Sequence, residues 1–205
     1  MKTHLLSMVF AALMLSPGLA APAAAQPAAQ DTSGAGAFVD KLADSAFDVL
    51  KGSNGGTPTA AQRSRFRSLL TKDFAVKSLG DRLIRRWKPT ITPAQYAAYS
   101  AAFPDYIVNT YADRLADYAN ADLKVTRVVA APGNVGWQVF TTVVKPGVQP
   151  VSAVWSVVRA GAAFQVTNLT VGGINLALTQ AADFDSYVQS HGFDALIAFM
   201  KSRES

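Results

Sequence analysis

The stretch that decides the fold is Thr92–Tyr118, TPAQYAAYSAAFPDYIVNTYADRLADY. Large aromatic and aliphatic side chains recur in it at steps of three and four residues, namely Tyr96, Tyr99, Phe103, Ile107, Tyr111, Leu115 and Tyr118. That spacing places them on one face of an α-helix. Such a wide apolar face must be buried, either against a sheet or against an apolar ligand, and the choice between the two bears directly on function.

The ends of this helix can be predicted from its capping residues. Thr92 is a suitable N-cap, Pro93 occupies the first helical position, and Gln95 completes a capping box. Pro104 lies inside the helix and predicts a kink or a break, because proline removes one backbone hydrogen bond and clashes with the preceding turn. We expect the helix to end near Asn120.

The segment before this helix also has helical periodicity. Phe38–Leu50 is amphipathic, and the glycine-rich run Gly52–Pro58 breaks it. Thr59 is placed to cap a second helix that reaches about Leu70. Short helical pieces continue over Phe74–Lys88.

After residue 120 the apolar pattern becomes that of β-strands. Four segments rich in Val, Thr, Phe and Trp are separated by Pro-Gly and Ala-Gly turns, which predicts antiparallel hairpins over Leu123–Ala131, Val135–Lys145, Val151–Arg159 and Ala163–Val171. In the last of these segments the apolar residues slip by one position near Thr167-Asn168. Such a slip predicts a β-bulge.

The chain closes with helices. Gly172-Gly173 marks a bend, and helices are expected over about Thr179–Ser190 and Phe193–Lys201. Helices, a run of strands and helices again predict an α+β fold. We expect a curved antiparallel sheet of four to five strands with helices packed on one face.

The first 25 residues have the layout of a secretory signal peptide. A short basic start precedes the apolar run Leu5–Leu15, and Ala23–Ala25 forms an A-x-A cleavage site. The run is shorter than the roughly 20 apolar residues of a membrane span. We therefore expect cleavage after Ala25, with Ala20 as the alternative site, rather than an uncleaved anchor.

The mature chain is expected to be an exported, single-domain protein. Residues 26–33 are predicted to be a flexible N-terminus, and residues 34–205 to form one domain. The sequence contains no cysteine, which excludes disulfides, thiolate metal ligands and a lipoprotein attachment site.

Positive charge is concentrated between Arg63 and Lys88 in a chain of formal net charge +5. In an exported protein this excess favours anionic lipid surfaces or acidic partners over nucleic acid. Arg82, Arg85 and Arg86 are the candidates for such contact. The alternative is an ordinary solvated helix face.

The residues needed for catalysis are scarce. Beyond the predicted signal peptide the sequence holds one histidine, His191, and one glutamate, Glu204. No nucleophile elbow is present, and no spacing selects a metal site. We therefore predict no catalytic residues, no metal and no other cofactor, and a binding protein rather than an enzyme.

The binding candidates are apolar residues that seek burial. On helices they are Trp87, Tyr99, Phe103, Ile107 and Tyr111, and on strands Val143, Trp155, Val157, Val166, Leu169, Val171, Ile174 and Leu176. An ordinary protein core has the same composition. The residues alone leave open whether these side chains fill a core or surround a cavity.

Three motifs in this order resemble the MlaC/Ttg2D family of periplasmic phospholipid-binding proteins. They are the T-x-x-Q helix start with its aromatic face, the turn Gly173-Ile174-Asn175-Leu176, and the ending Gly192–Ile197, GFDALI. The resemblance covers roughly Phe38–Lys201. The sequence departs from the family at Asn168 and Gly172, where acidic residues are common, and at Pro104.

The resemblance implies an NTF2-like, cystatin-like fold with an apolar pocket between sheet and helices, whose cargo is a phospholipid. It implies a monomeric periplasmic carrier that moves lipid between an outer-membrane lipoprotein complex and an inner-membrane ABC transporter with its MCE-domain protein, and so maintains outer-membrane lipid asymmetry. A hopanoid-associated carrier of the same family, an NTF2-like enzyme acting on a small apolar substrate, and an adaptor with a filled core are the alternatives.

Overall fold

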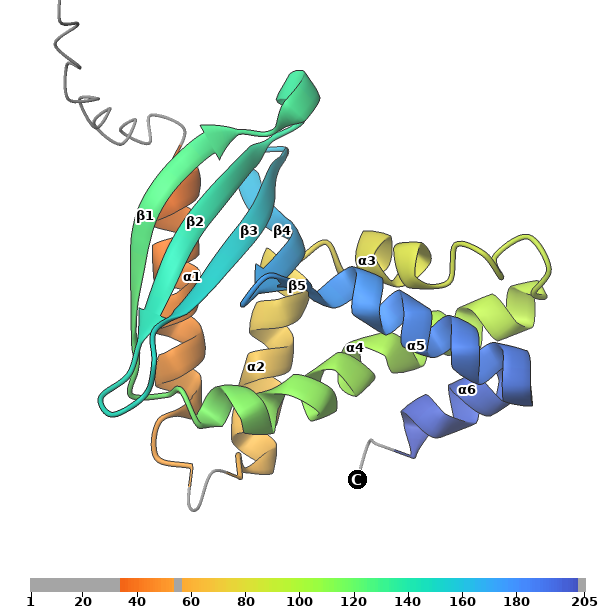
Figure 1. The fold of residues 1–205 in the computed structure, drawn as a ribbon. Coiled ribbons are helices and arrows are strands. Elements are labelled where there is room, and N and C mark those ends of the chain that lie inside the picture. The colour runs from red at the N-terminus through yellow and green to blue at the C-terminus, as the bar shows by residue number, and fades with distance from the viewer. Residues whose placement is uncertain (1–33, 54–56, 203–205) are drawn as a thin grey trace, which may run out of the picture.

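The computed structural model describes residues 34–53 and 57–202. The predicted signal peptide (1–25) and the predicted N-terminal segment (26–33) lie outside the described residues. Within those ranges the chain forms six α-helices and one five-stranded antiparallel sheet (Figure 1). The helices pack on one face of the curved sheet, so the predicted α+β architecture is confirmed.

The sheet is a meander in which each strand pairs with the next. Its strands are β1 (Asp122–Ala130), β2 (Trp137–Val144), β3 (Val151–Ala160), β4 (Ala163–Val171) and β5 (Ile174–Asn175). The four predicted hairpin strands are confirmed to within two residues at each end. The short strand β5 is the fifth strand of the predicted four to five and holds Ile174, which was expected on a strand; it forms because Gly172 and Gly173, at φ of 56° and 82°, turn the chain back onto β4.

The predicted bulge lies in β4 at Thr167. Ser156 pairs with Asn168 while Val157 pairs with Val166, so Thr167 is the extra residue. Because cross-strand partners share a face, the bulge returns Leu169 to the face that holds Val166. The apolar residues before and after the slip therefore all point toward the helices.

The first three helices cover this inner face. α1 (Ala35–Leu50) packs against β1 and β2, while α2 (Ala60–Asp73) and α3 (Val76–Leu83) pack against β4. Thr59 caps α2 as expected, and Gln62 completes a capping box that was not predicted. The junction between α2 and α3 is fixed to the sheet because the Ala75 backbone N–H donates to the Val166 carbonyl at 2.9 Å.

The helix quoted at the outset is α4 (Pro93–Ala116), and it begins as predicted. The Gln95 N–H donates to Thr92 Oγ1 at 3.2 Å, and the Thr92 N–H donates to Gln95 Oε1 at 2.9 Å. Of the two outcomes expected at Pro104, a kink or a break, the break is wrong, because the helix runs through Pro104 without interruption. One missing backbone bond is outweighed by the packing of both halves. The helix ends at Ala116, and turns replace its expected last residues up to Asn120.

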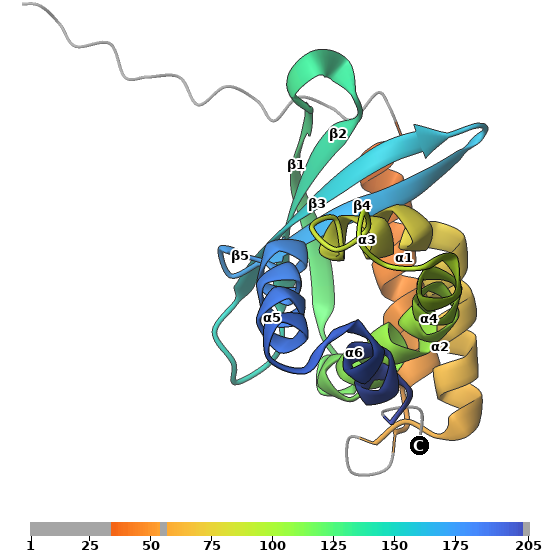
Figure 2. The same cartoon turned by 90° about the vertical axis from the view of Figure 1, so that its right-hand side faces the viewer.

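The last two helices complete a bundle around the first half of α4. They are α5 (Leu176–His191) and α6 (Phe193–Lys201), and Figure 2 shows them grouped with α3 and α4. α5 begins earlier than predicted because Asn175 caps it, accepting from the Leu178 N–H at 3.1 Å. Leu176 is therefore helical, which corrects its assignment to a strand. In the described part of the chain, no helix is both long and apolar enough to cross a bilayer.

Candidate functional site

An apolar cavity of about 340 Å³ lies between the sheet and the helices. Its walls come from five elements that are distant in sequence. One part of the wall comes from α2, α3 and the segment between them, namely Phe66, Leu70, Phe74, Val76, Leu79 and Leu83. Another part comes from α4 and the turn after it, namely Phe103, Pro104, Ile107, Tyr111, Arg114, Leu115 and Tyr118. β4 and α5 contribute Asn168, Leu169, Val171, Leu176, Ala177 and Gln180.

A second cavity of about 200 Å³ adjoins the first on the side of α1. Beyond the shared residues it is lined by Leu42, Ala43, Ala46, Phe47, Leu69, Leu123, Val143, Val151, Ala153 and Trp155. Six residues border both cavities, namely Phe66, Phe74, Leu115, Tyr118, Leu169 and Val171. These side chains form the partition between the two spaces.

The apolar face of α4 is divided between the core and the cavity. Tyr99 is 1% exposed and stacks on Phe103, with ring centroids 5.6 Å apart. Farther along the helix, Ile107, Tyr111 and Leu115 are only half-buried and border the first cavity. One half of the helix is therefore packed in the core, and the other half borders a cavity.

Eight of the thirteen apolar candidates line a cavity. Phe103, Ile107, Tyr111 and Leu176 border the first cavity, Val143 and Trp155 the second, and Leu169 and Val171 both. The other five lie elsewhere. Trp87, Tyr99, Val157 and Val166 pack within the protein, and Ile174 is 58% exposed on β5.

The packed candidates are held by contacts of their own. Trp87 Nε1 donates to Asp185 Oδ1 at 2.7 Å, which ties the turn after α3 to α5. The Tyr99 hydroxyl donates to the Gly80 carbonyl at 3.0 Å, and burial raises its pKa. Val157 and Val166 are at most 1% exposed, so neither has surface left for a ligand.

Three polar residues of the first cavity were missed by sequence reasoning: Arg114, Asn168 and Gln180. Arg114 is exposed, so it marks the side where the cavity reaches solvent. Gln180 is 8% exposed. A signal for Gln180 was present, because it shares the inward face of α5 with Ala177 and Phe184 at helical spacing.

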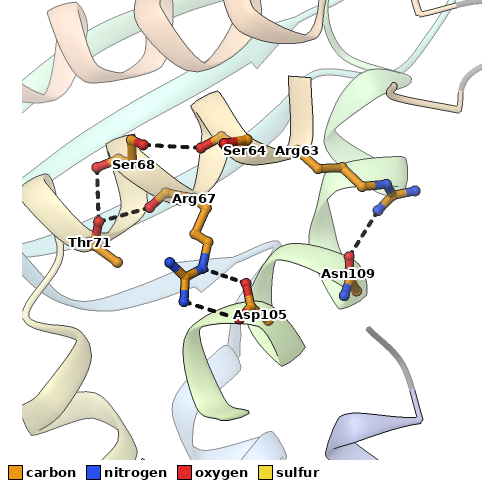
Figure 3. A network of polar contacts seen from close by, with 7 residues as sticks. All are labelled: Arg63, Ser64, Arg67, Ser68, Thr71, Asp105 and Asn109. Carbon is orange, nitrogen blue, oxygen red and sulfur yellow. Dashed lines mark hydrogen bonds and ion pairs between the residues drawn. The ribbon is translucent and has the colours of Figure 1, made fainter. Parts of the chain in front are cut away.

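Two arginines of the basic segment Arg63–Lys88 form ion pairs with aspartates of α4. Arg67 forms a two-pronged ion pair with Asp105, with Nη2 3.0 Å from Oδ2, and Arg63 Nη2 lies 2.6 Å from Asp113 Oδ1. Figure 3 shows the first of these pairs between α2 and α4. The local excess of charge is therefore partly neutralised by α4.

The three arginines proposed for surface contact differ in environment. Arg82 Nη1 donates to the Thr167 carbonyl at 3.2 Å. Arg86 lies over the Trp87 ring and 4.0 Å from Asp185. Arg85 is exposed and has no ion pair to a residue that the structure describes.

Acid and base groups are not gathered at either cavity. None of the described lining residues is an aspartate, glutamate or histidine. His191 is exposed at the end of α5 and stacks on Tyr187 at 4.5 Å. Across residues 34–53 and 57–202 no three side chains are grouped so as to hold a metal ion.

Comparison with known proteins agrees with this architecture. One solved structure of similar fold is that of the phospholipid-binding protein from Ralstonia solanacearum in complex with a phospholipid. The TM-score is 0.68 at 22% identity, and the match covers 83% of this chain and 96% of that one. The family model described as MlaC protein matches residues 40–202, which is most of the chain. This protein therefore belongs to the MlaC family.

Proposed function

We propose that this protein binds a phospholipid in the two adjoining cavities and carries it through the periplasm. The observation that carries the proposal is the pair of apolar cavities between sheet and helices in a member of the MlaC family. The relative from Ralstonia solanacearum, which shares the fold, was solved with a phospholipid bound. The first cavity, at about 340 Å³, falls within the range of ligand sites, about 300–1,000 Å³, and the adjoining second cavity adds about 200 Å³.

The energetics of lipid movement explain why such a cavity is needed. A diacyl lipid with about 30 methylene groups, at about 0.8 kcal/mol each, faces a cost of about 24 kcal/mol in water. A carrier must replace the bilayer interior with an apolar wall. Leu169, Val171 and Phe74 supply such a wall where the cavities adjoin.

The lipid phosphate is placed at Arg114 in this proposal. Among the described residues that line the first cavity, Arg114 is the one that carries a formal charge, and it lies at the exposed side. A guanidinium group is well suited to bind phosphate oxygens. The acyl chains would then lie inside and the headgroup at the mouth.

We infer a carrier rather than an enzyme because the cavity walls supply no acid/base pair among the residues described. Export through the predicted signal peptide would deliver it to the periplasm as a monomer. Its proposed partners are an inner-membrane MCE-domain protein of an ABC transporter and an outer-membrane lipoprotein complex, in a system that maintains outer-membrane asymmetry. Arg82, Arg85 and Arg86 are the proposed docking residues.

A transfer assay tests the carrier role. Donor vesicles hold a labelled phospholipid, acceptor vesicles hold none, and the purified protein is added in catalytic amounts. We expect the label to move to the acceptors at a rate proportional to protein concentration. Binding without transfer would leave a lipid-binding protein and remove the carrier role.

A further inference from the structure

We propose that the second cavity sets the length of the acyl chains that the protein accepts, and that three alanines in its wall, Ala43, Ala46 and Ala153, keep it open. This inference rests on the proposed function and adds to it a preference among phospholipids of different chain length. The second cavity, at about 200 Å³ beside the 340 Å³ of the first, supplies more than a third of the combined space. Long chains need that share of the space more than short chains do.

The lining of the second cavity suits an acyl chain rather than a headgroup. None of its described lining residues carries a formal charge. The indole N–H of Trp155 already donates to Thr141 Oγ1 at 3.0 Å, so it is not free to bind a ligand. Methylene groups can enter such a space, whereas a phosphate buried there without partners would be costly.

Small residues on α1 leave room for this cavity. The inward face of the helix carries Val39, which packs against β1 and β2, and Leu50, which packs against α2 and α4. Ala43 and Ala46 lie between these two residues and line the second cavity. Protein interiors are close-packed, and an apolar void lowers stability in proportion to its volume. A void kept open beside two alanines therefore indicates room for a ligand.

Ala153 has the same effect on the side of the sheet. It lies on the inner face of β3, 5% exposed, and lines the second cavity. Its cross-strand partners are Thr141 of β2 and Val171 of β4. Strands favour β-branched and aromatic residues, and a larger side chain at this position would project into the cavity. Small residues thus border the same cavity on the helix and on the sheet.

A competition between chain lengths tests the inference. Vesicles with equal amounts of dipalmitoyl and dilauroyl phosphatidylglycerol are offered to delipidated protein, and the bound lipids are extracted and identified by mass spectrometry. Every variant meets the same vesicles, so the ratio of bound dipalmitoyl to dilauroyl lipid can be compared directly. Ala46→Leu adds an isopropyl group to the wall of the second cavity. We expect it to lower this ratio about tenfold relative to the wild type, the effect of excluding about two methylene groups.

Further variants place the effect in the second cavity. Ala153→Val changes the opposite wall and should lower the ratio in the same direction, so it decides the matter should Ala46→Leu fail to fold. Ala37→Leu, on the exposed side of α1, is the matched control and should leave the ratio unchanged. Palmitoyl lysophosphatidylglycerol has a single chain, which the first cavity can hold. It should bind to Ala46→Leu as it does to the wild type.

The inference and the proposed function fail in different ways. An unchanged ratio in folded Ala46→Leu or Ala153→Val would overturn the inference and leave phospholipid binding intact. An equal loss of lysophosphatidylglycerol binding in Ala46→Leu would also overturn it, because the substitution would then act on the whole site. Binding of none of these lipids by the wild-type protein would overturn the proposed function itself.

Discussion

Arg114 is the charged residue among the described residues that line the first cavity. Its guanidinium has no ion pair with the described residues, so it is available to a lipid phosphate. Replacing it with alanine should weaken phosphatidylglycerol binding by about fivefold, because a solvent-exposed charge pair contributes about 1 kcal/mol. Vesicle-binding titrations of the variant would measure this loss.

The control for Arg114 is Arg65→Ala, which removes an exposed arginine of α2 that lines neither cavity. We expect Arg65→Ala to bind phosphatidylglycerol as the wild type does, and both variants to bind neutral diacylglycerol equally well. An equal loss in the two variants would mean that the effect is general surface charge rather than a phosphate site.

Asp81 is a residue whose ionisation contributes to stability. Partial burial raises its pKa, but hydrogen bonds from Lys88, Tyr96 and Lys77 outweigh that effect and lower the pKa to about 2. Since the ordinary pKa of an aspartate is 3.8, the folded state is stabilised by the ionised group at pH above about 4. That contribution falls as the pH decreases from about 4 to 2, because the unfolded chain binds the proton first.

Asp81→Asn should therefore lower the free energy of unfolding by about 1 to 2 kcal/mol at neutral pH and by much less near pH 2. Urea unfolding across this pH range measures the difference. Asp40→Asn, an exposed change on α1, serves as the control and should show little difference at any pH. A pH-independent loss at Asp81 would indicate a role in packing rather than in ionisation.

At the scale of elements, α2 is joined to α4 by arginine–aspartate pairs across the wall of the first cavity. Arg67 and Asp105 are 45% and 35% exposed, so solvent screens their attraction. We expect Arg67→Ala to lower the free energy of unfolding by less than about 1 kcal/mol, and the loss to shrink in high salt. A double-mutant cycle with Asp105→Ala measures the pair, and a coupling energy that does not respond to salt would contradict this account.

The strongest test of the cavities is a substitution in β4, because Leu169 of this strand borders both of them. The larger side chain of Leu169→Trp should fill space in both cavities, so we expect much less bound lipid. The melting temperature of the lipid-free protein should rise, since an apolar void is replaced by contacts. Val154→Trp, on the outer face of the sheet, is the matched control and should bind lipid normally. Normal lipid binding by Leu169→Trp would place the ligand elsewhere.

At the scale of the whole molecule, much of the fold could be predicted from local patterns. The capping box at Thr92 and the slip at Thr167 act through neighbouring residues, so the sequence shows them directly. Pro104 was predicted to kink or break the helix, and the break does not occur because tertiary packing holds the helix together around it. Leu176 was misjudged because the cap at Asn175 starts α5 early.

The binding site was less predictable than the fold. Trp87, Tyr99 and Val166 have the same apolar character as Ile107 and Leu169, but they meet protein atoms rather than a cavity. Periodicity reports which side chains turn inward, and it does not report whether the space they face is filled. Distant segments decide that, as when α2 brings Phe66 and Leu70 to the wall.

The central claim is that the cavities hold a phospholipid, and the most direct measurement is native mass spectrometry of the protein purified from Gram-negative cells. We predict a species heavier than the bare chain by the mass of a phospholipid, which lipid extraction identifies and which Leu169→Trp lacks. A protein that carries no lipid, and takes up none after incubation with phospholipid vesicles, would contradict the account.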